Sequence, residues 1–183
     1  KGDHPKQAKG FVIRQLQVAG GAEVAGALGE WLLDDELWED AAQALLAIGD
    51  TANQFLKAHP NAKGKQLLTN VQALGVLKVN NAAVRIGELV TADDATLRQV
   101  AARALADMAD AGAVSTLLKA ADTAKGFERT KQTDACLQLA ENLLSLGRKK
   151  EATRIYQHLR DTRKDPDEAY IREAAGHGLK QAD

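Results

Sequence analysis

The chain has 183 residues, of which 45% are hydrophobic and 4% aromatic, with three Pro and a net charge of −1. This composition favours a folded, helix-rich chain over a disordered one. The near balance of 24 basic and 25 acidic residues gives no reason to expect nucleic acid or a membrane as the partner. The single cysteine, Cys136, excludes an internal disulfide and a multi-cysteine metal site, and we expect it in the core.

Apolar residues recur at helical spacing along most of the chain. Residues 1–10 are polar and lack such a stripe, so we expect a loose N-terminal segment that extends to about Lys6. The weakest helical stretch is 53–62, because His59-Pro60-Asn61 has turn chemistry. The expected helices span 11–19, 22–33, 35–48, 53–62, 63–77, 82–90, 94–108, 111–122, 133–146, 149–160 and a last helix that Asp165-Pro166 opens.

Acidic residues and glycines mark the expected turns. Asp34 and Asp94 stand at helix starts, where a carboxylate can accept free amide hydrogens and favours the positive end of the helix dipole. Residues 124–128 are expected to form a longer loop. Because the chain starts at Lys1 without Met, we expect it to be part of a larger protein. No secretory signal or run long enough to span a bilayer is visible, and the compartment is left open.

A leucine near the end of every second helix marks an internal repeat. Successive leucines are 29, 29, 31, 38 and 36 residues apart, a period typical of helical solenoids. Four positions after three of them stands a glycine, where a helix end favours a residue tolerant of positive φ; Lys78 and Ala109 break this pattern. The anchor leucines are Leu16, Leu45, Leu74, Leu105, Leu143 and Leu179, and the glycines are Gly20, Gly49 and Gly147.

One copy of the repeat resembles a known family. Residues 92–118 carry Asp94, Arg98, an Ala-Ala and an Ala-Leu step and then Ala113-Val114, and they resemble a HEAT repeat, an armadillo-type unit. Residues 136–159 are similar to a tetratricopeptide helix pair. The resemblance implies an all-α, right-handed superhelix of ten or eleven short, antiparallel-paired helices. It would form one domain over 1–183, HEAT-like over 11–126 and looser over 127–183, that works by binding.

A polar residue stands two positions before each anchor leucine. Stacking of the repeats should align these residues along one face, and in HEAT arrays the second helices line the concave side. The alternative is that they are only the solvated edge of each helix. We call this set the polar ladder; it consists of Arg14, Gln43, Gln72, Arg103, Glu141 and His177.

Trp31 and Trp38 flank the acidic turn at Asp34-Asp35. We expect the two rings to fill space between repeats, with an aromatic binding platform as the alternative. No Lys or Arg occurs over 15–54, whereas 61–133 has ten basic against seven acidic residues. We favour the interpretation that the acidic and the basic stretch are two solvated faces over the alternative that they form a charge gradient that docks a partner. Arg98 is expected to pair with Asp94 or with the equivalent acid of the neighbouring repeat.

No residue set amounts to a catalytic, cofactor or metal site. The four histidines lack ligand spacing, and neither serine lies in a nucleophile elbow. We therefore expect a non-catalytic scaffold that binds a protein or peptide. One alternative is a HEAT-like domain acting on nucleic acid, such as an alkylated-base DNA glycosylase, but its tempting residues (Trp31, Trp38, Asp34 and Asp35) lie where basic residues are absent. A second alternative is a passive spacer. Oligomeric state is left open.

Overall fold

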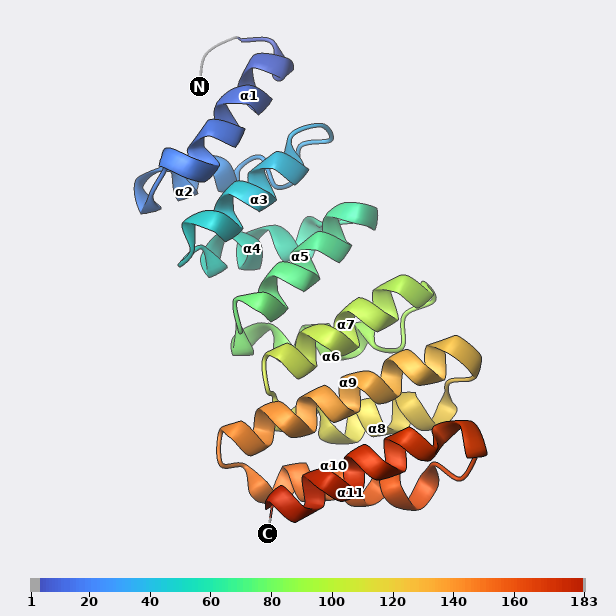
Figure 1. The fold of residues 1–183 in the computed structure, drawn as a ribbon. Coiled ribbons are helices and arrows are strands. Elements are labelled where there is room, and N and C mark those ends of the chain that lie inside the picture. Colours follow the sequence, from blue (N-terminus) through green and yellow to red (C-terminus); the bar gives the residue numbers. More distant parts are fainter. Residues whose placement is uncertain (1–3, 183) are drawn as a thin grey trace. The chain divides into compact units, whose positions relative to one another are not determined.

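The computed structural model describes residues 4–182, and these are all-α: eleven α-helices and four short 3-10 helices, with no strand in the described part (Figure 1). The α-helices are α1 (Lys6–Ala19), α2 (Ala22–Gly29), α3 (Trp38–Ile48), α4 (Ala52–Ala58), α5 (Gly64–Val76), α6 (Ala83–Leu89), α7 (Ala95–Asp107), α8 (Val114–Thr123), α9 (Gly126–Ser145), α10 (Lys149–Thr162) and α11 (Ala169–Ala182). The 3-10 helices are η1 (His59–Asn61), η2 (Asn80–Ala82), η3 (Ala111–Ala113) and η4 (Pro166–Glu168).

The helices form two compact units, unit 1 up to Val79 and unit 2 from Asn80. In unit 1, α3 contacts α1, α2 and α5, while α4 contacts α2 and α5. In unit 2, α9 contacts α7, α8, α10 and α11, while α8 also contacts α10. Each unit therefore has one row of odd-numbered helices in contact with one another and a row of even-numbered helices packed against it (Figure 1).

The core of each unit is built from small and branched apolar side chains on the facing stripes of these helices. Four of the six anchor leucines, Leu45, Leu74, Leu105 and Leu143, are at most 1% exposed. Alanines on the same stripes are buried as well, and their small side chains let neighbouring helices approach closely. The repeat period in the sequence thus corresponds to a packing period within each unit.

The same backbone device ends three of the repeats. At the ends of α5, α7 and α9, the carbonyl of the anchor leucine accepts the N–H of the residue five positions later, as in Val79 N to Leu74 O at 3.0 Å. The residue before that donor has positive φ: 52° at Lys78, 53° at Ala109 and 74° at Gly147. These are Schellman-type ends. Lys78 and Ala109 therefore adopt the left-handed backbone that the sequence predicts only for glycine, whereas Gly20, with φ of −84°, does not adopt it.

The expected loop at 124–128 is wrong. Only residues 124 and 125 stay outside the helices, because Gly126 has φ of 55° and starts α9, which runs for 20 residues. Glu128 lies in the first turn of α9, where Arg98 binds it. Gln132 and Thr133 look polar in sequence, yet both are buried on the inner face of α9. The stretched repeat interval reflects a longer helix.

Other boundaries shift by a few residues. α1 begins at Lys6, five residues before the expected start, and Lys6 Nζ lies 3.0 Å from Glu36 Oε1. Residues 1–3 of the expected loose segment lie outside the described part. The acidic turn lies just before α3, and in it Asp34 Oδ1 accepts hydrogen bonds from the backbone N–H groups of Glu36 and Leu37. Pro166 opens the 3-10 turn η4, which leads into α11.

Candidate functional site

The polar ladder occupies equivalent, exposed positions. Its members lie one each on α1, α3, α5, α7, α9 and α11, and all six are exposed. Within each unit these helices contact one another in succession. The structure therefore brings Arg14, Gln43 and Gln72 onto neighbouring helices of unit 1, and Arg103, Glu141 and His177 onto neighbouring helices of unit 2. That the ladder binds a partner stays a prediction.

Two of the ladder's basic side chains are already paired. Arg14 Nη1 donates to Asp40 Oδ2 at 2.7 Å, which links α1 to α3. Arg103 Nε donates to Asp107 Oδ1 at 2.9 Å within α7. Both arginines remain more than half exposed, so a ligand carboxylate could still reach their other N–H groups. These pairs hold the side chains in defined positions at the surface.

Two ladder members of unit 2 line the same hollow. Glu141 of α9 and His177 of α11 share its wall with Tyr156 of α10 and with Tyr170 and Glu173 of α11, around a space of about 400 Å³. Tyr170 is half exposed and Tyr156 is buried. Burial, with a smaller contribution from the charge of Glu141, raises the pKa of Tyr156 to about 12. Burial first, and the nearby carboxylates second, also raise the pKa of Tyr170. Both tyrosines therefore stay neutral at physiological pH. We call this the carboxylate–tyrosine pocket.

The ring of Tyr156 is fixed by a close approach of α11. A Cβ on Gly178 would lie 2.3 Å from Tyr156 Cζ, so only glycine allows the backbone of α11 to pass this close to the ring. The ring is thereby clamped between α10 and α11. A rigid floor of this kind keeps the shape of the carboxylate–tyrosine pocket defined in the absence of ligand.

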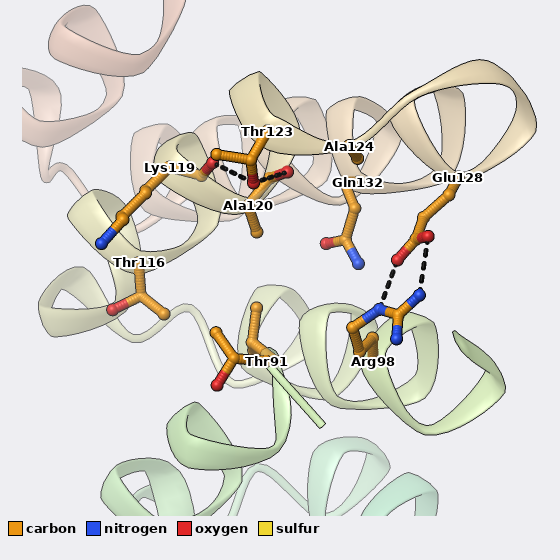
Figure 2. Close-up of a pocket in the computed structure, with 10 residues that line it drawn as sticks. Thr91, Arg98, Thr116, Lys119, Ala120, Thr123, Ala124, Glu128 and Gln132 are labelled. Carbon is orange, nitrogen blue, oxygen red and sulfur yellow. Dashed lines mark hydrogen bonds and ion pairs between the residues drawn. The ribbon is translucent and has the colours of Figure 1, made fainter. Parts of the chain in front are cut away.

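A second hollow lies within unit 2 where the end of α6 and the start of α7 face α8 and α9, and its volume is about 500 Å³ (Figure 2). Figure 2 shows Thr116 and Lys119 at one end and the Arg98–Glu128 pair at the other, with the Gln132 carboxamide pointing into the space between. Val90 and two alanines provide apolar lining. We call this the glutamine pocket.

Arg98 forms one wall of the glutamine pocket and has a structural task. Its Nη2 donates to Glu128 Oε2 at 2.8 Å and its Nε donates to Oε1 of the same carboxylate, which makes a bidentate pair across two repeats. Its Nη1 donates to the carbonyls of Ala92 and Asp93 at 2.8 Å each. The hydrogen bond from Arg98, opposed by burial, lowers the pKa of Glu128. The partner acid does lie in the next repeat, but it is not the counterpart of Asp94, because Lys125 occupies that position at the start of α9. Asp94 itself caps α7 by accepting from the backbone N–H groups of Thr96 and Leu97.

Gln132 is the unusual member of the glutamine pocket. Its side chain is 1% exposed, and within the described residues neither Nε2 nor Oε1 has a hydrogen-bond partner. Thr91 and Thr123 nearby direct their hydroxyl hydrogens at helix carbonyls, at Glu88 O and at Lys119 O. Burial of a carboxamide without partners costs free energy of folding, so Gln132 presents an unpaired donor and an unpaired acceptor to the pocket.

An ionic network surrounds the buried Arg163 in unit 2. Arg163 is 1% exposed, and its Nη1 donates to Asp122 Oδ1 at 2.7 Å. His158 Nε2 lies 2.8 Å from the other oxygen of Asp122. Burial of Asp122 opposes ionisation, but the hydrogen bonds from Arg163 and His158 outweigh it and lower its pKa. Glu168 accepts two hydrogen bonds from Arg129, which lower its pKa. These groups tie α8, α9, α10 and η4 together.

Asp34 and Trp38, two of the residues named for the DNA-glycosylase alternative, make contacts within the fold. Asp34 accepts two backbone N–H groups, the largest cause of its lowered pKa, and lies 3.5 Å from Lys6 Nζ. Trp31 and Trp38 are both half-buried, and Trp38 packs in the region of Phe55 and Asn70. Across residues 4–182, no group of three or more His, Cys, Asp or Glu side chains is placed to hold a metal ion. The helices described there include none with the length and apolarity that crossing a membrane requires.

Sequence reasoning singled out Glu141, His177 and Arg98 but missed several other residues that line the two pockets. Gln132 carried a usable signal, because it stands three and four residues before Ala135 and Cys136 on the buried stripe of α9, where an apolar side chain is normal. Tyr156 and Tyr170 are the only tyrosines of the chain, which marks them as unusual but gives no position. Glu173 and Lys119 carried no signal, because their pockets form only when three or more helices pack.

The sequence matches no protein-family model and no curated protein. The all-α, helical-repeat character therefore rests on the structure, and the HEAT-like and tetratricopeptide-like readings rest on the residues quoted above.

Proposed function

We propose that this chain is a non-catalytic binding module of the HEAT-like, right-handed solenoid kind, and that its polar ladder binds an extended peptide. The supporting observation is the carboxylate–tyrosine pocket. There, two ladder residues from different helices, Glu141 and His177, meet two tyrosines around one hollow.

The chemistry of this pocket selects a basic side chain. Glu141 and Glu173 provide two carboxylates, and no Lys or Arg is among the residues that line it. Tyr170 is half exposed and provides an aromatic ring whose face can attract a cation, while the buried Tyr156 forms the floor of the hollow. A guanidinium or ammonium on an otherwise polar peptide would satisfy both features, and a guanidinium would also form paired hydrogen bonds to a carboxylate. We therefore assign a Lys- or Arg-containing peptide as the ligand.

The rest of the ladder provides sequence-tolerant contacts. Gln43 and Gln72 are exposed amides on neighbouring helices of unit 1, and an amide can both donate to and accept from a peptide backbone. Such groups recognise an extended chain with little dependence on its side chains. In this proposal the exposed amides provide backbone contacts within unit 1, and the carboxylate–tyrosine pocket selects a charged residue within unit 2.

The test is fluorescence anisotropy with two labelled twelve-residue Gly-Ser peptides, one with four interspersed Arg and one with four interspersed Glu. We expect saturable binding of the Arg peptide only. The double variant Glu141→Gln, Glu173→Gln should weaken it about tenfold or more, because it removes two charge-assisted partners. The matched control, Glu88→Gln with Asp167→Asn, removes the same charge from exposed positions elsewhere in unit 2 and should leave binding unchanged.

The rival functions give different results in the same assay. A passive spacer binds neither peptide, and a nucleic-acid module binds a labelled DNA duplex in preference to both. Equal loss in the double variant and its charge-matched control would show that net charge, and not the pocket, attracts the peptide. The triple variant Gln43→Ala, Gln72→Ala, Arg103→Ala tests the ladder separately: unchanged affinity would confine binding to the pocket and contradict the ladder.

A further inference from the structure

We infer that the glutamine pocket is a second binding site, and that it takes the carboxyl-terminal end of a peptide. It shares no lining residue with the carboxylate–tyrosine pocket, and the inference does not rest on the polar ladder.

The first argument is the unsatisfied amide. Gln132 lines the hollow but is only 1% exposed, and both of its polar ends lack partners in the described structure. Buried polar groups in native proteins are nearly always paired. A group that offers both a donor and an acceptor complements a peptide amide, which presents a carbonyl and an N–H.

The second argument is charge. Two cationic side chains line the pocket, and one of them, Arg98, is neutralised by Glu128 and by two backbone carbonyls. The other, Lys119, is exposed at the opposite end and has no carboxylate within salt-bridge distance among residues 4–182. The pocket therefore carries one uncompensated positive charge, and an anionic group placed there would be paired.

The third argument is the arrangement of these features. The Gln132 amide and the Lys119 cation lie along one hollow together with the hydroxyl-bearing side chains of Thr116 and Thr123 (Figure 2). Val90 and Ala120 add apolar lining. The end of a peptide chain carries this sequence of groups: an amide, a side chain and a terminal carboxylate. The proposed pose places the last amide at Gln132 and the carboxylate at Lys119.

The experiment uses the whole chain and three probes: N-acetylated tetrapeptides randomised at all four positions with free carboxyl ends, the same peptides with amidated ends, and N-acetylglycine. Binding is followed through the Gln132 side-chain NH₂ signal and neighbouring backbone amides in ¹⁵N-labelled protein. We expect the free-acid tetrapeptides to shift these signals and the amidated ones to do so at least about fivefold more weakly. A stronger response to N-acetylglycine than to the tetrapeptides would overturn the peptide assignment.

Two substitutions separate a ligand role from a structural one. Gln132→Leu removes an unpaired amide and keeps its approximate volume, so we expect it to abolish the response while raising Tm by about 2–4 °C. The matched control is Gln138→Leu on the same helix, whose Nε2 already donates to Asn142 Oδ1 at 3.2 Å; it should keep the response and gain no stability. Lys119→Gln should remove the preference for the free acid. A lower Tm in Gln132→Leu, or no signal shift with any probe, would show that the amide is satisfied by bound water and would overturn the inference.

Discussion

Replacing Gly178 with Ala tests how closely α10 and α11 are packed. A Cβ there would lie 2.3 Å from Tyr156 Cζ and 2.5 Å from both Cε atoms, which is about 1 Å inside an ordinary carbon contact. Tyr156 is only 2% exposed, so the ring cannot swing into solvent. Overpacking of this kind costs about 1–3 kcal/mol, and the better helix propensity of Ala returns up to about 1 kcal/mol. We therefore expect the free energy of unfolding to fall by about 1–2 kcal/mol, measured by urea denaturation and far-UV circular dichroism.

The control is Gly176→Ala, two residues earlier on the same helix, where a Cβ would meet nothing within 4 Å. Only the propensity change applies there, so stability should rise by about 0.5–1 kcal/mol. In a Tyr156→Leu background, Gly178→Ala should lower the free energy of unfolding by less than it does in the unchanged protein, because the ring that its Cβ would meet is gone. If the two glycine variants shift the urea midpoint in the same direction and by the same amount, the close contact between α11 and the ring is refuted.

Three further predictions concern stability and reactivity. Ala109→Gly should stabilise unit 2 by about 1 kcal/mol, because Ala109 has φ of 53°, a left-handed conformation that glycine adopts without strain. Ala174→Gly within α11 should destabilise unit 2 by a similar amount, because glycine is a poor helix former, and the urea midpoints of the two variants test both expectations. Asp122 has a lowered pKa in the folded state, so its contribution to the free energy of unfolding is present above the unfolded pKa near 3.8 and is lost as pH falls through the folded pKa. Urea midpoints between pH 6 and 3 should therefore fall less steeply in Asp122→Asn than in the unchanged protein. Equal slopes would contradict this. Burial raises the pKa of Cys136 to about 12, so a disulfide reagent at pH 8 should label it only at the rate of unfolding, and fast labelling of native protein would show that the thiol is accessible.

Local patterns in the sequence were sufficient to predict the helices, because the apolar residues of a buried helix face recur in the sequence at helical spacing. They also placed every ladder residue at an exposed position, since a polar residue two positions before a buried leucine lies on the opposite side of its helix. The cap at Asp94 and the turn at His59–Asn61 followed in the same way from the chemistry of single residues.

The failures share a physical cause, which is that tertiary packing overrode local preference. The sequence predicts a loop at 124–128, yet α9 begins at Gly126, and the burial of Gln132 and Thr133 against α8 and Arg163 helps to hold its first half in a helix. Lys78 and Ala109 adopt positive φ because the hydrogen bonds to Leu74 and Leu105 and the packing of the next helix require it. Pockets that draw on several helices leave no trace in the order of residues along any one of them.

The links between repeats have a consequence for how unit 2 opens. The ends of stacked helical arrays usually fray first, because a terminal repeat has only one neighbour. Here Glu168, just before α11, accepts from Arg129 at 2.6 and 3.2 Å and lies 3.8 Å from the buried Arg163. Detaching the last helix together with η4 would remove this carboxylate from the buried guanidinium of Arg163 and from the partly exposed guanidinium of Arg129. The C-terminal helix should therefore open together with α9 and α10, and its amide hydrogens should exchange at the rate of the whole block.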